Sequence, residues 1–105
     1  MSFRVRLTRE AEADLERLFD FVLERELARA AGNLELAEQA LHAIRVGIAT
    51  LETSPFTCRK AGQSPFLREL IVSFGRSGYV ALFEIVSETE VVVAAVRHQL
   101  EEDFH

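Results

Sequence analysis

Several residue types are scarce in this 105-residue chain. Tryptophan is absent, tyrosine and methionine occur once each, and Cys58 is the only cysteine. A single cysteine excludes an intrachain disulfide and a metal site built from several cysteines, and it suits a reducing compartment. No apolar stretch is long enough to span a bilayer, and none near the start of the chain resembles a signal peptide. We therefore expect a cytoplasmic protein without a membrane segment.

The composition is that of a folded protein, but the charge balance is acidic. Hydrophobic residues make up 49% of the chain and charged residues 28%, which is typical of a globular protein. At this length we expect one domain, residues 1–105, built around one core. The formal net charge is −5, and Glu101, Glu102 and Asp103 contribute three of these charges. Proteins that bind nucleic acid through many phosphates show the opposite balance.

The first half of the chain predicts one strand and two amphipathic helices. Residues 3–7 alternate apolar and basic side chains, which indicates a half-buried strand. Thr8 is the predicted N-cap of the first helix, and Asn33, after the break at Gly32, is the predicted N-cap of the second. The apolar residues of the two helices recur at spacings of three and four: Ala11, Leu15, Leu18 and Val22, then Ala37, Leu41, Ile44, Ile48 and Leu51.

The second half predicts a loop and an antiparallel meander. Residues 53–65 contain two prolines and a glycine and show no periodicity, so we predict a loop there. Three strand-like runs follow at 66–74, 79–86 and 90–96, separated by two short turns. The predicted fold is α+β, with an antiparallel helix hairpin packed on a mainly antiparallel four-stranded sheet in the order β-α-α-β-β-β. The last run is apolar on both faces, so we expect a central strand or one that a partner covers.

Four segments, in this order along the chain, carry a resemblance to a known family. Residues 8–15 (TREAEADL) resemble its entry to the first helix, and residues 68–70 (REL) resemble its arginine-bearing strand. Residues 78–85 (GYVALFEI) are similar to its aromatic-led central strand, and residues 93–101 (VAAVRHQLE) to its closing Arg-His segment. The family is the ParE/RelE superfamily of toxins from type II toxin–antitoxin systems, and the closing segment resembles ParE-like members in particular.

The resemblance implies a bacterial toxin that a cognate antitoxin wraps and neutralises, in a heterotetramer or a larger complex. ParE-like members poison DNA gyrase, whereas RelE-like members cleave mRNA on the ribosome. A third alternative is an inactive relative that only binds the antitoxin. The sequence contains no glycine-rich phosphate loop and no metal-ligand spacing of His and Cys, so we expect neither a cofactor nor a metal.

The residues themselves favour an inhibitor over an enzyme. Cleavage of RNA through its 2′-hydroxyl needs a base, an acid and cations beside one phosphate. The candidates are Arg68, Arg97 and His98, but neighbouring strand residues such as Arg97 and His98 point to opposite faces. Phe104 stands where many relatives carry tyrosine, and phenylalanine has no proton to donate. We therefore favour a non-enzymatic gyrase inhibitor over an mRNA endoribonuclease.

Two sets of contact residues follow from these expectations. Side chains able to meet an acidic or phosphate-bearing target are arginines, one histidine and an aromatic residue near a turn: Arg68, Arg76, Tyr79, Arg97 and His98. The broad apolar stripe of the first helix suggests a groove along the helix hairpin that an antitoxin segment covers. The candidates for that contact are Leu15, Phe19, Val22, Leu41 and Ile44.

Overall fold

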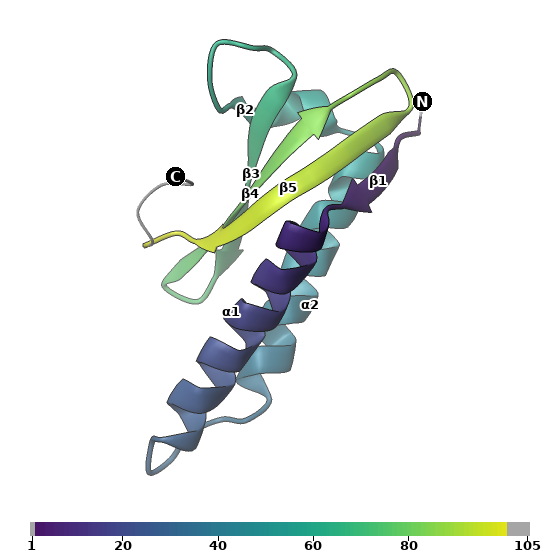
Figure 1. The fold of residues 1–105 in the computed structure, drawn as a ribbon. Coiled ribbons are helices and arrows are strands. Elements are labelled where there is room, and N and C mark those ends of the chain that lie inside the picture. Colours follow the sequence, from purple (N-terminus) through teal and green to yellow (C-terminus); the bar gives the residue numbers. More distant parts are fainter. Residues whose placement is uncertain (1, 101–105) are drawn as a thin grey trace.

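The structure, a computed structural model, describes residues 2–100, and Figure 1 shows its fold. Its elements in chain order are β1 (Arg4–Leu7), α1 (Arg9–Leu27), α2 (Leu36–Ala49), two 3-10 turns η1 (Thr50–Glu52) and η2 (Pro55–Thr57), β2 (Arg59–Lys60), β3 (Leu67–Phe74), β4 (Ser77–Ile85) and β5 (Glu90–His98). The predicted α+β class is confirmed, and so are the strand that opens the chain, the two helices and the three strands of the meander.

The sheet has one strand more than predicted. Its order is β1-β5-β4-β3-β2, with β1 parallel to β5 and every other pair antiparallel. The additional strand, β2, lies inside the stretch that the sequence predicts as a loop. Arg59 of β2 pairs with Glu69 of β3, and its Nε donates a hydrogen bond to Glu69 Oε1 over 2.8 Å. A strand of two residues has no periodicity, which is why the pattern of the sequence does not predict it.

Strand β5 contains a bulge that explains its apolar run. The pairing of β4 with β5 shifts register between Leu82 and Phe83, which leaves Ala94 as the extra residue of β5. Because the bulge changes the alternation of side chains, three valines of β5 are buried: Val91, Val93 and Val96. The strand is also interior, between β1 and β4. The expectation of a central strand is therefore confirmed.

The hydrophobic core lies between the helix hairpin and one face of the sheet. Phe83 of β4 is fully buried and is the largest such side chain, and burial of a side chain of that size contributes about 1.5–3 kcal/mol. The residues around it come from both helices and the central strands: Ala11, Leu15, Leu18, Ala40, Ile44, Ile48, Tyr79, Ala81, Val91, Val93 and Val96. The predicted periodic residues of the helices are thus mainly core residues.

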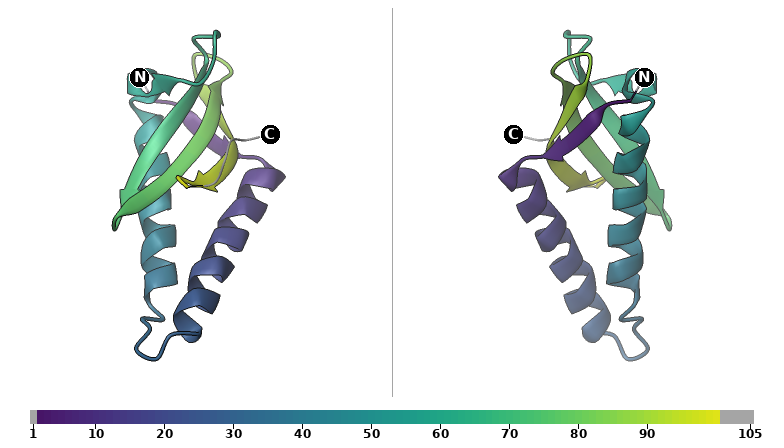
Figure 2. Two further views of the ribbon diagram at one scale, coloured as in Figure 1. Left: turned by 90° about the vertical axis from the view of Figure 1, so that its left-hand side faces the viewer. Right: turned by 90° about the vertical axis from the view of Figure 1, so that its right-hand side faces the viewer.

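The helix hairpin extends well beyond the sheet. Both views in Figure 2 show the connection between α1 and α2 at one end of the molecule and the helices spreading apart toward the sheet. This arrangement makes the molecule elongated, with extents of 49 × 26 × 24 Å. Within residues 2–100, no helix combines the length and the hydropathy needed to cross a membrane.

Glu26 organises the end of the hairpin. Its side chain is only 3% exposed, and Oε1 accepts a hydrogen bond from the backbone N–H of Asn33 over 3.0 Å. Oε2 lies 3.2 Å from Arg25 Nε and from Arg29 Nη1. The hydrogen bond from Asn33 is the main reason that the pKa of Glu26 lies below its ordinary value, and the two arginines add to it against the effect of burial. Glu26 therefore fixes the path of the chain between the two helices.

The predicted N-cap of α2 is wrong by two residues. The helix begins at Leu36, so Glu35 occupies the cap position, and its side chain makes no capping hydrogen bond. Asn33 lies two residues before Glu35, and its Oδ1 accepts a hydrogen bond from the backbone N–H of Glu35 over 3.0 Å. An asparagine favours such a local turn as readily as a cap, and the contact with Glu26 holds it there.

Candidate functional site

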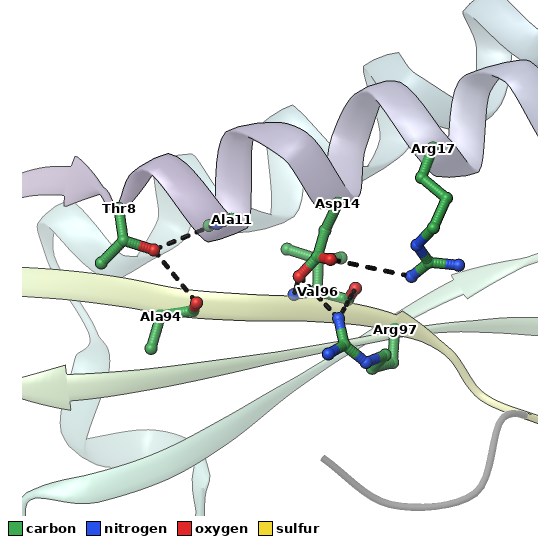
Figure 3. Close-up of polar contacts among 7 residues, drawn as sticks. All are labelled: Thr8, Ala11, Asp14, Arg17, Ala94, Val96 and Arg97. Carbon is green, nitrogen blue, oxygen red and sulfur yellow. Dashed lines mark hydrogen bonds and ion pairs between the residues drawn. The ribbon is translucent and has the colours of Figure 1, made fainter. Parts of the chain in front are cut away.

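Helix α1 closes the outer edge of β5 (Figure 3). Strand β1 pairs with β5 only as far as Leu7 opposite Val93, so the edge beyond that point needs other partners. The Thr8 backbone N–H donates to Val93 O over 3.0 Å, and Thr8 Oγ1 donates to Ala94 O over 3.0 Å. The same hydroxyl accepts from Ala11 N–H, which confirms Thr8 as the N-cap of α1.

Asp14 completes this closure and holds Arg97. Its Oδ2 accepts a hydrogen bond from the backbone N–H of Val96 over 2.9 Å, and Arg97 Nη1 lies 2.6 Å from the same oxygen. Arg17 Nη2 approaches Oδ1 at 3.8 Å. Arg97, a candidate for target contact and for RNA cleavage, therefore joins β5 to α1. The acidic residues 101–103, which contribute three negative charges, lie outside the described residues.

His98 faces the helices, on the side of β5 opposite to Arg97. Its ring packs edge-on against Tyr79 with centroids 5.5 Å apart. The Leu100 backbone N–H donates to Nδ1 over 3.1 Å, so the neutral ring carries its proton on Nε2, which lies 3.0 Å from Ser77 Oγ. Both ring nitrogens therefore have hydrogen-bond partners within the fold.

Tyr79 lies in the core instead of on the surface. Tyr79 is 3% exposed. Burial raises the pKa of its hydroxyl, and the positive charge of Arg25 partly offsets that effect. Tyr79 is opposite Val72 and His98 in the sheet, on the side that the helices cover. The pattern of a glycine followed by an aromatic residue near a turn suggested an exposed contact, but the alternation along β4 turns the ring inward.

Arg68 forms hydrogen bonds with backbone carbonyl groups of the segment before β3. Its Nε donates to Pro65 O over 2.7 Å, and its Nη1 donates to Phe56 O and Cys58 O over 2.9 and 2.7 Å. The guanidinium also lies 5.2 Å from the centre of the Phe56 ring. Arg68 is therefore a structural tie in this fold, and three of its hydrogen bonds go to carbonyl groups.

The three residues expected for RNA cleavage do not converge. Arg68 precedes Val72 by four residues, and Val72 is level with His98 across the sheet, so Arg68 lies roughly 13 Å farther along the strand direction. It is also two strands away from β5. Arg97 and His98 share β5 but point to its two faces. No single phosphate would meet all three side chains in this arrangement.

The candidates for antitoxin contact divide into buried and accessible residues. Leu15, Val22 and Ile44 are buried by this chain itself, and Leu15 and Ile44 belong to the core that the helices form with the sheet. Phe19 and Leu41 are half-buried and line a groove of 370 Å³ between α1 and α2. Leu15, although only 2% exposed, and four charged residues complete this helix groove: Glu12, Glu16, Asp20 and Arg45. Of the five candidates, Phe19 and Leu41 present surface to a partner.

Arg76, the remaining target candidate, is exposed at the tip of the β3–β4 hairpin. Gly75 has φ of +61°, and the two-residue turn Gly75-Arg76 is consistent with the type II′ geometry that matches the twist of paired strands. Glycine is needed there because other residues rarely adopt that conformation.

Sequence reasoning missed an aromatic pocket at the end of the sheet near the N-terminus. This cavity of 720 Å³ is lined by Phe3, Phe56, Ser64, Phe66, Glu84, Ile85, Val86, Ser87 and Glu88. Ser-Pro-Phe occurs twice in the predicted loop and its flank, at residues 54–56 and 64–66. A phenylalanine that directly follows a proline in a loop is the signal that could have drawn attention to it.

Chemistry based on a metal or a thiol finds little support in the described residues. Within residues 2–100, no group of three His, Cys, Asp or Glu side chains is arranged to hold a metal ion. Cys58 is half-buried, and burial raises the pKa of its thiol, although Arg68 partly counteracts this. A raised pKa disfavours the thiolate, which is the nucleophilic form.

Comparison with known proteins gives one family and one fold. Residues 5–102 match the family described as the ParE toxin of the type II toxin–antitoxin system parDE. A solved structure described as a chromosomal ParDE TA system from P. aeruginosa superposes with a TM-score of 0.69, covering 92% of this chain and 96% of that chain. The two sequences are 21% identical, so this likeness concerns the fold. No curated protein matches the chain significantly.

Proposed function

The chain belongs to the ParE toxin family of type II toxin–antitoxin systems, and on that basis we propose that it is a toxin that inhibits DNA gyrase and that a cognate antitoxin neutralises. Gyrase is a cytoplasmic enzyme, so the proposed site of action is the cytoplasm. The observation that carries the choice of gyrase is the separation of Arg68, Arg97 and His98 in the fold.

This separation supports inhibition over RNA cleavage. Transfer of a proton to and from the reacting oxygens requires an acid and a base within hydrogen-bond reach of one phosphodiester. Arg68 and Arg97 instead bond to carbonyl groups and to Asp14, and both ring nitrogens of His98 are engaged. The net charge of −5 also opposes docking on ribosomal RNA. Inhibition of gyrase by surface contact needs no such arrangement.

The helix groove is the proposed site of the antitoxin. Phe19 and Leu41 supply apolar surface, and three of the four charged residues that complete the groove are acidic: Glu12, Glu16 and Asp20. An amphipathic helix of the antitoxin with apolar anchors and flanking Lys or Arg would match this surface. The P. aeruginosa structure, described as a ParDE TA system, supports an antitoxin as the partner. The complex is proposed to be a heterotetramer or larger.

The target is tested with two parallel reactions. Purified toxin is added to a gyrase supercoiling assay and to a translation reaction in which mRNA integrity is followed. We expect loss of supercoiling or accumulation of cleaved DNA, with mRNA intact. Ribosome-dependent mRNA cleavage that disappears in Arg68→Ala would assign the protein to the endoribonucleases instead. A chain inactive in both assays that still binds its antitoxin would be the inactive relative.

The antitoxin site is tested with two matched substitutions on α1. Phe19→Asp places a charge in the helix groove, and Phe21→Asp places the same charge on an exposed phenylalanine outside it. We expect Phe19→Asp to weaken antitoxin binding by roughly tenfold or more, because that loss equals about 1.4 kcal/mol and a buried anchor contributes at least that much. Equal losses in both variants would place the contact elsewhere. Light scattering of the wild-type complex gives its stoichiometry.

A further inference from the structure

Three phenylalanines from distant parts of the chain meet in the aromatic pocket. Phe56 of η2 is central, with ring centroids 6.5 Å from Phe3 and 6.4 Å from Phe66, and both pairs meet edge to face. Phe56 and Phe66 are 50% and 49% exposed, and Val86 on the rim is also exposed. Half-exposed aromatic side chains that surround a cavity are typical of protein interaction sites and are costly to leave in water.

The pocket is preformed by polar contacts around it. Arg68 donates to Phe56 O and covers its ring, which fixes η2 against β3. The Phe3 backbone N–H donates to Glu52 O over 2.7 Å, and the Ile85 backbone N–H donates to Phe66 O over 2.8 Å. Each aromatic wall is thus anchored through its own backbone. A partner that enters such a pocket loses little free energy to ordering of the protein.

The rim of the pocket is acidic. Glu84 at the end of β4 and Glu88 in the β4–β5 turn are exposed and line the cavity. Within residues 2–100, neither carboxylate takes part in an ion pair or a side-chain hydrogen bond, and no Lys or Arg lines the cavity. An occupant with an apolar side chain next to Lys or Arg would therefore fill the pocket and pair with its rim.

We propose that the aromatic pocket is the surface through which this toxin docks on its protein target, and that it receives an apolar side chain flanked by Lys or Arg. The inference rests on the proposed function as a gyrase inhibitor. The pocket lies at the end of the molecule that carries the N-terminus and the β4–β5 turn, away from the hairpin connection (Figures 1 and 2). Its walls share no residue with the helix groove, so the two partners have separate surfaces.

The test compares two pocket variants with two controls in the full-length toxin. Phe66→Ala removes one aromatic wall, and Glu88→Lys reverses one rim charge. The matched controls are Phe21→Ala, a phenylalanine that is 57% exposed and does not line the pocket, and Glu24→Lys, an exposed acid on α1 with the same change in net charge. Affinities for purified gyrase and for the antitoxin are measured for each variant, and circular dichroism confirms folding.

We expect both pocket variants to bind gyrase roughly tenfold more weakly or worse, with antitoxin affinity and both controls unchanged. Wild-type toxin that inhibits gyrase, together with pocket variants that inhibit it equally, would overturn the inference and leave the proposed function standing. Wild-type toxin without effect on gyrase would overturn both the proposed function and this inference. Loss of antitoxin affinity in the pocket variants, or a toxin dimer that Phe66→Ala dissociates, would assign the pocket to another occupant and reject the inference. If Phe66→Ala unfolds, Glu88→Lys decides alone, because it lies in an exposed turn.

Discussion

Asp14 and Glu26 perform similar tasks at the two ends of α1. Each carboxylate accepts a hydrogen bond from a backbone N–H outside its own helix, Asp14 from Val96 over 2.9 Å and Glu26 from Asn33 over 3.0 Å. The bond of Asp14 joins positions 82 residues apart, whereas that of Glu26 joins positions seven residues apart. The first attaches the helix to the sheet, and the second shapes only the turn that follows the helix.

The arginines of the two sites differ in exposure. The side chain of Arg97, which lies 2.6 Å from Asp14, is 28% exposed, and that of the more distant Arg17 is 47% exposed. The side chains of Arg25 and Arg29, both 3.2 Å from Glu26, are 45% and 63% exposed. Water and salt screen the more exposed pairs, so they contribute less to stability. We infer that Asp14 matters to the stability of the whole fold, and that Glu26 matters chiefly to the local order of the hairpin connection.

The largest effect is expected from Asp14→Ala. The substitution leaves the Val96 N–H without its partner at the edge of β5 and removes the carboxylate from Arg97, so we expect a loss of about 2 kcal/mol in the free energy of unfolding. Urea denaturation measures it. Glu24→Ala, which removes an exposed acid from the same helix, serves as the control and should change stability by less than about 0.5 kcal/mol. Equal losses in the two variants would mean that the contacts of Asp14 do not add to the stability of the fold.

Hydrogen bonds between residues far apart in the sequence, such as that from Val96 to Asp14, cannot be predicted from local sequence patterns. The helices and the meander follow from local periodicity, and Thr8 was predictable as an N-cap because its partner, Ala11, is three residues away. The second bond of Thr8, to Ala94, spans 86 residues, and no local pattern contains it. The same holds for the hydrogen bond from Arg68 to Phe56 O, which joins β3 to the irregular segment before it.

The candidate site was predictable to a smaller extent than the fold. Strand alternation predicted that Arg97 and His98 lie on opposite faces, and the pairing of β5 with β4 agrees with that prediction. The aromatic pocket depends on Phe3, Phe56 and Phe66 being brought together by η2 and by the ends of three strands. Irregular segments have no periodicity, so the sequence does not predict the pocket, and only the three-dimensional structure shows it. The apolar spacing correctly predicts amphipathic helices, but the sequence does not show which of the apolar residues are buried within the chain itself.

A smaller effect is expected from Thr8→Ala at the same edge. The alanine loses both the N-cap bond to Ala11 and the bond to Ala94 O, and removal of such a cap costs about 1 kcal/mol. Thr8→Ser keeps the hydroxyl and should restore most of that loss in the same denaturation experiment. A serine variant as unstable as the alanine variant would show that packing of the methyl group, and not the hydroxyl, closes the edge of β5.

The smallest effect at neutral pH is expected from Glu26→Gln, because glutamine retains an oxygen that accepts from Asn33 and loses only ion pairs with exposed arginines. The substitution acts mainly on the response to acid. The pKa of Glu26 lies below its ordinary value of 4.5, so its ionised form contributes stability that is fully present above that pH and is lost as the pH falls through the pKa of the folded state. Stability measured from pH 6 downward should therefore decline less steeply below about pH 4.5 in Glu26→Gln than in the wild type.

Because the contact of Glu26 with Asn33 is local, amide hydrogen exchange near Asn33 should become faster in Glu26→Gln at neutral pH, while amide exchange in β5 should stay unchanged. Faster exchange in β5 would mean that Glu26, like Asp14, supports the sheet, and the contrast between the two ends of the helix would no longer hold.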